Sequence, residues 1–251
     1  RTLFVMLTMQ SWPTKLFLDR TENPEWVNAM MMDFLQESHH NGQQAYNRLL
    51  QDIQERLDAN CNKTNADFGL PPPQNARTEL EREMLRYDPI AEQHNVTAAK
   101  ARVNASGHST WTQQMDAIYN QICEHLDNDT GDLIFVQGKA GVGKTTLNRV
   151  LLAECRAREM VGLVCAPTAL AASLYEHGMT CHEACKLNIV EDEQWESYAS
   201  RLQSFPGRCE LLIACRLLII DEVYNVHRGN FNAMIKALQQ IRNSTHHSAG
   251  M

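Results

Sequence analysis

The sequence predicts an α/β protein, in which a parallel sheet carries helices on both faces and a mainly helical region precedes it. Two observations predict this class. Residues 138–145 read Gly-Lys-Ala-Gly-Val-Gly-Lys-Thr, and this glycine-rich loop lies between a short apolar run, 133–136, and a helical pattern. From there to residue 241, strand-like and helix-like patterns alternate, which is typical of a sheet of parallel strands with helical crossovers.

Residues 1–58 have the patterning of helices. Pro24 suits a first helical position, and an apolar stripe at helical spacing follows it. A second helix is expected over 43–57, with its apolar residues on one face. The simplest interpretation of this region is a pair of helices that pack on a common core.

Residues 59–110 are interpreted as a connector. The segment 60–65 is polar, and Pro71-Pro72-Pro73 excludes helix and favours an extended chain. A short helix is expected over 78–87 and should end at Asp88-Pro89. Small polar residues at 104–110 are a plausible hinge.

Residues 111–251 form the predicted α/β domain. Strands are expected at 133–137, 161–165 and 217–220. Helices are expected at 113–126, 144–156, 169–176 and 231–241.

The loop at 138–145 matches G-x-x-x-x-G-K-[ST], the phosphate-binding loop (P-loop) of nucleoside triphosphatases. Gly138, Gly141 and Gly143 let backbone N–H groups approach phosphates, and the N-terminus of the next helix adds a positive dipole end. Lys144 would stabilise charge on the β- and γ-phosphates, and the Thr145 hydroxyl would ligate Mg²⁺. The alternative, a turn that only joins strand to helix, gives the Lys-Thr pair no purpose. The expected nucleotide contacts are Gly138, Lys139, Ala140, Gly141, Val142, Gly143, Lys144, Thr145 and Thr146.

Two adjacent acids follow the apolar run 217–220. Asp221 can hold Mg²⁺, usually through water, and Glu222 can orient and deprotonate an attacking water. Catalytic groups gather at strand carboxyl ends in such sheets, so we expect this tip to complete the site begun by the P-loop. A water-activating glutamate favours ATP hydrolysis over phosphoryl transfer to a small molecule. A solvated acidic turn is the alternative.

Bulk properties limit the remaining possibilities. A net charge of −7 gives no general argument for nucleic-acid binding, so any such surface must be local. Eight cysteines without a C-x-x-C pair suggest reduced thiols rather than a disulfide framework. No stretch approaches the length needed to span a bilayer, so no membrane partner is expected. The chain begins at Arg1 and stops in a polar stretch, so we expect a fragment of a longer protein.

Residues 110–242 resemble the first motor domain of the Pif (petite integration frequency) DNA helicases, in the RecD-like branch of superfamily one. The resemblance implies a RecA-like P-loop domain. The four blocks that carry it are Gln113-Gln114 with Ala117, Tyr119 and Ile122; residues 138–146; residues 166–172 with 178–182; and residues 218–223. They occur in the family's order and spacing. Three departures from the family pattern are Ala169, Glu183 and Tyr224.

The upstream part resembles the segment that precedes the helicase in Helitron-type transposases. The residues concerned are Leu3-Phe4, a Pro-x-x-Leu at 13–16, and Asp67-Phe68-Gly69-Leu70-Pro71.

These resemblances imply a DNA helicase that uses ATP and Mg²⁺ and moves on single-stranded DNA, 5′ to 3′ by family analogy. Gln114 would contact adenine, while Pro167, Thr168 and His182 would contact DNA. For His182, a satisfied polar residue on a loop is the alternative. Membership would further imply DNA repair, recombination, replication or telomere maintenance, and a nuclear location if the source is eukaryotic.

In this family ATP lies between two RecA-like domains of one chain. The sensor motif Gly-Asp-x-x-Gln and the second motor domain are expected to follow residue 251. Two other interpretations stay open: an inactive transposon-derived relic, and a P-loop ATPase switch that does not act on DNA. A zinc site at Cys181-His182-Glu183-Ala184-Cys185 is not favoured, because a structural zinc ion needs four ligands.

Overall fold

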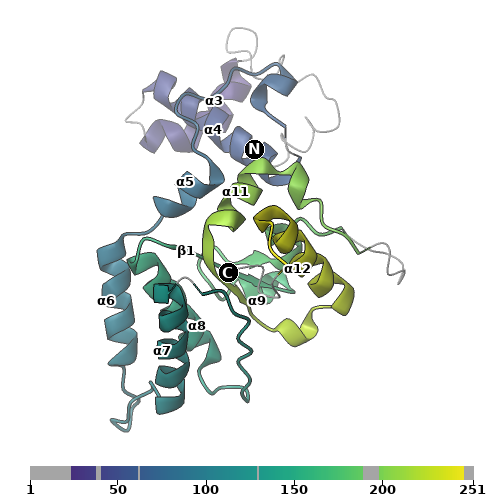
Figure 1. The fold of residues 1–251 in the computed structure, drawn as a ribbon. Coiled ribbons are helices and arrows are strands. Elements are labelled where there is room, and N and C mark those ends of the chain that lie inside the picture. The colour runs from purple at the N-terminus through teal and green to yellow at the C-terminus, as the bar shows by residue number, and fades with distance from the viewer. Residues whose placement is uncertain (1–23, 38–40, 62, 129, 189–197, 246–251) are drawn as a thin grey trace. The chain divides into compact units, whose positions relative to one another are not determined.

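The computed structural model describes residues 24–37, 41–61, 63–128, 130–188 and 198–245. These residues belong to two compact units, 1–78 and 79–251 (Figure 1). The three zones inferred from the sequence stay a prediction. The motifs at 3–4 and 13–16 lie outside the described residues.

The first unit is built on two helices, α3 (Pro24–Glu37) and α4 (Gly42–Asn60), followed by a 3₁₀ turn, η1 (Asn65–Phe68). Asn41 caps α4 by accepting hydrogen bonds from the backbone N–H groups of the second and third residues after it. The facing apolar stripes of α3 and α4 form the core of this unit: Val27, Met31, Ala45, Leu49, Leu50, Ile53 and Leu57, with Leu70. The helix pair expected from the sequence is therefore present.

The segment Asp67-Phe68-Gly69 has a local structural role in this unit. The Asp67 carboxylate accepts hydrogen bonds from the Thr64 backbone N–H at 2.7 Å and from the Thr64 hydroxyl at 2.9 Å. Gly69 then takes a left-handed conformation with φ +71°, which a glycine adopts without steric cost. These contacts end the turn and direct Leu70 into the core.

The second unit begins with α5 (Glu79–Met84) and α6 (Pro89–Lys100). The sequence predicts one helix over 78–87 that stops at Asp88-Pro89, whereas the structure ends α5 at Met84 and begins a second helix at Pro89. The Asp88 carboxylate accepts from the backbone N–H of Ile90 at 3.0 Å, and Pro89 occupies the first turn. This pair ends one helix and starts the next, because proline lacks only an N–H that a first-turn residue does not need.

A three-stranded parallel sheet forms the centre of this unit, in the order β2-β1-β3. Its strands are β1 (Val161–Ala166), β2 (Met179–Thr180) and β3 (Cys215–Ile220). The remaining elements are α7 (Gln113–Asn128), α8 (Lys144–Ala157), α9 (Ala169–Ala172), α10 (Cys181–Ala184), η3 (Leu202–Ser204), α11 (Pro206–Ala214), η4 (Val223–Asn225) and α12 (Arg228–Arg242).

Helices cover both faces of the sheet (Figure 1). Alternate residues of β3 point to opposite faces, as a strand requires. Leu217 and Ile219 pack with the core of α7 and α8, whereas Leu218 packs with α11 and α12. The chain therefore has the predicted α/β class, a RecA-like P-loop domain with a parallel sheet.

The strand expected at 133–137 is not formed. Ile134 and Val136 pack against the α7–α8 core, but Leu133 and Phe135 are 57% and 71% exposed. A strand needs a neighbour to share its backbone hydrogen bonds. Both edges of β1 are occupied by β2 and β3, and no strand within the described residues pairs with the second edge of β3. The apolar run therefore packs through Ile134 and Val136 without pairing to a strand of the described residues.

Candidate active site

The P-loop and the end of β3 line one cavity of about 1000 Å³ in the second unit. From the P-loop come Gly138, Lys144 and Thr145, and from the strand tip come Asp221 and Glu222. Parallel pairing explains the arrangement: the carboxyl ends of parallel strands lie at one edge of the sheet, next to the N-terminus of the crossover helix α8. Two segments 77 positions apart in the sequence, Lys144 to Asp221, thus face one space.

The P-loop has the backbone conformation that its glycines predict. Gly141 and Gly143 have φ values of +78° and +93°, a region that other residues rarely enter. A Cβ on Gly138 would lie 3.0 Å from a methyl group of Val142. Lys144 begins α8, and its Nζ donates to the carbonyl oxygens of Gly138 at 2.7 Å and Lys139 at 2.8 Å. These two hydrogen bonds hold the Lys144 side chain against the backbone of its own loop.

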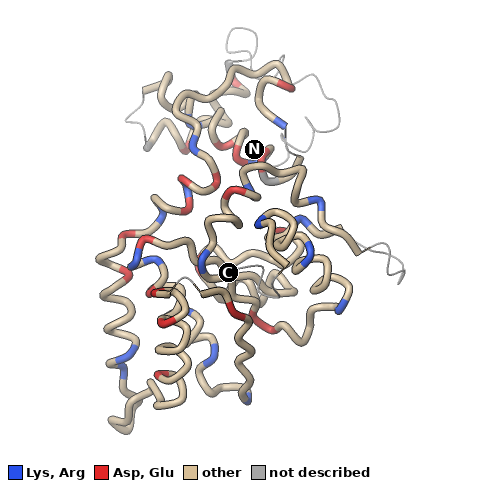
Figure 2. Tube along the Cα trace, viewed as in Figure 1, with Lys and Arg blue, Asp and Glu red and all other residues tan. Residues whose placement is uncertain are grey.

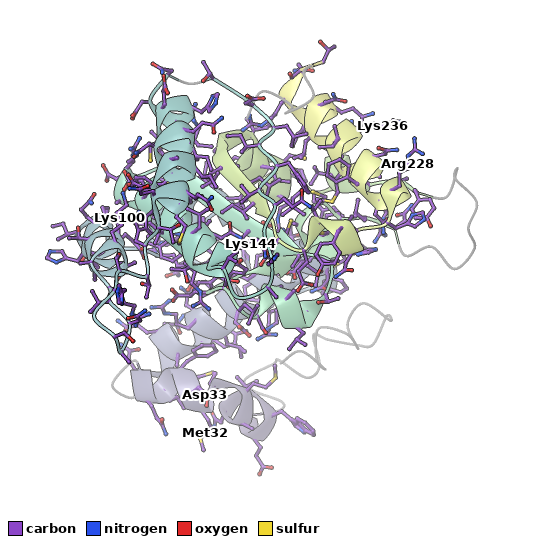
Figure 3. The ribbon with its side chains drawn as sticks, turned by 90° about the horizontal axis from the view of Figure 1, so that it is seen from below. Met32, Asp33, Lys100, Lys144, Arg228 and Lys236 are labelled. Atoms are coloured by element: carbon purple, nitrogen blue, oxygen red, sulfur yellow. The ribbon has the colours of Figure 1, made fainter. Side chains whose placement is uncertain are left out.

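Figure 3 shows the surroundings of Lys144. It lies at the start of α8, near the middle of the unit, whereas Arg228 and Lys236 project from α12 at one side. Of the basic residues labelled there, Lys144 is the one that belongs to the P-loop.

Asp221 directly follows β3, and hydrogen bonds fix its orientation. Its backbone N–H donates to the carbonyl oxygen of Cys165 at 2.9 Å. One carboxylate oxygen accepts from the Glu222 backbone N–H at 2.9 Å, and the other accepts from the Tyr175 hydroxyl at 2.5 Å. Glu222 has φ +51°, which is unusual for a residue with a side chain. This turn places both acids at the cavity.

Tyr175 is a residue of the site that the sequence analysis missed. It is only 4% exposed, and its hydroxyl also accepts from Asn148 Nδ2 of α8 at 2.9 Å. Burial, together with the hydrogen bond to Asp221, raises the pKa of Tyr175 to about 12. No motif marks this tyrosine, because its importance depends on a contact between residues 46 positions apart.

The residues present suit a Mg²⁺ ion. The two predicted ligands, Thr145 and Asp221, line the same cavity, and Asp221 is held by the Tyr175 hydroxyl. One carboxylate and one hydroxyl are an appropriate protein contribution, since Mg²⁺ keeps several waters and takes phosphate oxygens from the substrate. The described residues contain no group of three or more His, Cys, Asp or Glu side chains that could hold a metal.

Gln114 lies in the first turn of α7 and is exposed. It is not among the residues that line the cavity. The next residue, Met115, is buried, and a Cβ on Gly143 would lie 3.4 Å from its methyl group. The α7 segment is therefore beside the P-loop, and the adenine contact of Gln114 stays a prediction.

The three predicted DNA contacts lie at the same edge of the sheet. The register pairs Ala166 with Thr180, so the segments that carry Pro167-Thr168 and His182 leave the sheet together. The Thr168 hydroxyl accepts from Ala171 N–H at 3.2 Å as the cap of α9. None of the three residues lines the cavity.

The His182 ring lies 3.5 Å from the Asn230 side chain, which fits a satisfied polar residue as well as a DNA contact. Figure 2 shows basic and acidic residues interspersed over the elements of this unit. A DNA path there would depend on backbone N–H groups and hydroxyls more than on a broad basic face.

The fold and the site define a P-loop nucleotide-binding domain. A family model described as PIF1-like helicase matches residues 110–250, just over half of the chain. The chain belongs to this family, and the helicase class predicted from its motifs is confirmed. The chain is also 27% identical over 136 residues, 54% of its length, to ATP-dependent DNA helicase PIF6 of Trypanosoma brucei brucei. The match spans only 16% of that helicase.

As for membranes, none of the helices within the described residues combines the length and the apolar character needed to cross one.

Proposed function

We propose that this chain is the ATP-binding motor domain of a DNA helicase that couples ATP hydrolysis to movement on single-stranded DNA, 5′ to 3′. The observation that carries the proposal is the cavity shared by Lys144, Thr145, Asp221 and Glu222. A loop suited to a triphosphate and a carboxylate pair suited to Mg²⁺ and water belong to one hydrolytic reaction.

Each residue has a distinct role in the proposed reaction. Lys144 leaves its loop carbonyls to stabilise charge on the β- and γ-phosphates. Thr145 and Asp221 hold Mg²⁺, which neutralises charge on the phosphates when bound. Glu222 orients the attacking water and accepts its proton. Gln114 contacts the adenine.

The proposal extends from the nucleotide to DNA. In this proposal the single-stranded DNA is contacted by Pro167, Thr168 and His182. These residues follow β1 and β2 at the same edge of the sheet as Asp221, so a change in the bound nucleotide can alter how tightly DNA is held. The matched relative is a much longer helicase, so the whole activity belongs to a larger protein in which a second RecA-like domain closes the site. Repair, recombination, replication or telomere maintenance in the nucleus is the proposed setting.

The test compares three proteins: this chain, a version extended through a second motor domain, and the extended version with Lys144→Ala. We expect weak nucleotide binding and negligible hydrolysis from the chain alone. The extended protein should hydrolyse ATP faster with single-stranded DNA, and Lys144→Ala should abolish turnover without changing the circular dichroism spectrum.

The other outcomes separate the alternatives. Hydrolysis that does not respond to DNA, with no DNA binding in a titration, would indicate a P-loop ATPase switch. An extended protein that neither binds nor hydrolyses ATP would indicate an inactive relic. Full turnover in the Lys144→Ala variant would remove the lysine from its role.

A further inference from the structure

The Tyr175 hydroxyl lies where the P-loop helix and the acidic strand tip approach each other. It donates to Asp221 Oδ2 at 2.5 Å and accepts from Asn148 Nδ2 of α8 at 2.9 Å. The ring packs with Leu152 of α8 and Val164 of β1. A single side chain therefore joins the predicted metal ligand Asp221 to the helix that follows the P-loop.

The hydrogen-bonding capacity of a phenol fixes the direction of these contacts. A tyrosine hydroxyl has one hydrogen to donate and two lone pairs to accept with. The carboxylate of Asp221 can only accept, so the hydrogen goes to Asp221. The amide of Asn148 then donates to the tyrosine oxygen.

This arrangement prepares Asp221 for a cation. The Asp221 carboxylate is held on one side by Tyr175 and on the other by the Glu222 backbone N–H, so its rotation is restricted. Groups that hold ligating side chains in this way tune metal affinity.

We propose that Tyr175 is a positioning residue for the magnesium site, holding the carboxylate of Asp221 in the orientation that Mg²⁺ and nucleotide require. This inference rests on the proposed function. Tyr175 acts through Asp221, because it does not itself line the cavity of the P-loop.

A second tyrosine provides a matched control. The Tyr119 hydroxyl donates to the Glu154 carboxylate at 2.6 Å, and its ring is 8% exposed. The chemistry is the same, a buried phenol on a carboxylate, but neither Tyr119 nor Glu154 lines the cavity. Removing either hydroxyl should affect folding similarly, while only removal of the Tyr175 hydroxyl should change the Mg²⁺ requirement for nucleotide binding.

The experiment titrates a fluorescent ADP analogue into the 251-residue chain at a series of Mg²⁺ concentrations and in EDTA. Tyr175→Phe should require about tenfold more Mg²⁺ to reach half of the Mg²⁺-dependent gain in ADP affinity, the lower end of the effect of removing such a partner. Affinity in EDTA should equal that of the wild type. Tyr119→Phe should leave the Mg²⁺ requirement unchanged.

Asn148→Ala is a second variant at a less buried position, and it frees the tyrosine hydroxyl from α8. It should shift the Mg²⁺ requirement in the same direction by a smaller factor, so the inference can be tested even if Tyr175→Phe folds poorly. A Tyr175→Phe protein with the Mg²⁺ requirement of the wild type would overturn the positioning role alone. A wild-type chain that binds no nucleotide in either condition would overturn the proposed function and this inference with it.

Discussion

Arg208 of α11 donates a hydrogen bond from Nε to Glu79 of α5 at 2.6 Å, across 129 positions of the sequence. The two side chains are only 7% and 11% exposed. Nη1 of the same arginine donates to the carbonyl oxygen of Glu183 at 3.2 Å, at the end of α10. One buried guanidinium thus connects the start of the second unit to the block that follows β2.

This contact predicts a large effect of Glu79→Ala. The variant would leave the charge of Arg208 buried without its carboxylate, and breaking a buried pair on one side costs roughly 3 kcal/mol. Urea denaturation of the full chain should show a loss of that size in the free energy of unfolding. Glu81→Ala, on an exposed position of the same helix, should change it by less than about 0.5 kcal/mol. Equal effects would contradict this role of the ion pair.

Gly178 predicts a second stability effect. A Cβ there would lie 2.2 Å from the carbonyl oxygen of Ala172, a backbone atom that cannot move aside without shifting α9. We expect Gly178→Ala to destabilise by about 2 kcal/mol or more, as overpacking does. Gly207→Ala is the control, because its Cβ would meet nothing closer than Glu79 Cγ at 3.8 Å. If Gly207→Ala has the lower melting temperature of the two, α9 can shift to accommodate the added methyl group and the prediction is wrong.

The sequence was sufficient for the elements whose signals are local. The glycines and the Lys-Thr pair of the P-loop predicted its conformation, since a positive φ at Gly141 and Gly143 follows from residue type. The apolar runs at 161–165 and 217–220 predicted β1 and β3 because continuous apolar strands suit a sheet covered on both faces. The class of the fold follows from these signals.

The errors arose where structure depends on distant partners. Residues 133–137 have a strand-like pattern, but hydrogen bonds from a neighbouring strand decide whether a strand forms. Asp88-Pro89 was interpreted only as a stop, although the same pair caps and begins α6. Tyr175 gave no signal at all, because its hydroxyl matters only once the fold brings Asp221 and Asn148 to it.

Glu154 predicts a pH dependence of stability. Burial opposes ionisation of its carboxyl, but hydrogen bonds from Tyr119 and Arg158 outweigh that effect and hold its pKa below the ordinary value. A folded-state pKa that is lowered adds stability above the unfolded pKa, and this stability is lost as the pH falls through the folded value. Part of the acid destabilisation of this chain should therefore come from Glu154.

The measurement compares the free energy of unfolding by urea at about pH 7 and about pH 3. Glu154→Gln should lose less stability between these conditions than the wild type, although it starts from a lower value at neutral pH. The stability that Tyr119→Phe loses on acidification should lie between the losses of Glu154→Gln and the wild type, since this variant removes one of the hydrogen bonds that favour the carboxylate. A Glu154→Gln protein that loses as much free energy of unfolding on acidification as the wild type would contradict this assignment.

The eight cysteines should divide into two classes of reactivity. Cys61 and Cys209 are partly exposed, while the other six are buried. Burial raises the pKa of Cys155, Cys185 and Cys215 to about 12, so these thiols form little of the reactive thiolate. A disulfide reagent at about pH 8 should therefore label two thiols rapidly in the native chain and all eight after denaturation.

Mass spectrometry should place the fast label on Cys61 and Cys209, and Cys61→Ser should remove one rapid equivalent. Rapid labelling of Cys215 would mean that β3 opens far more readily than its packing implies.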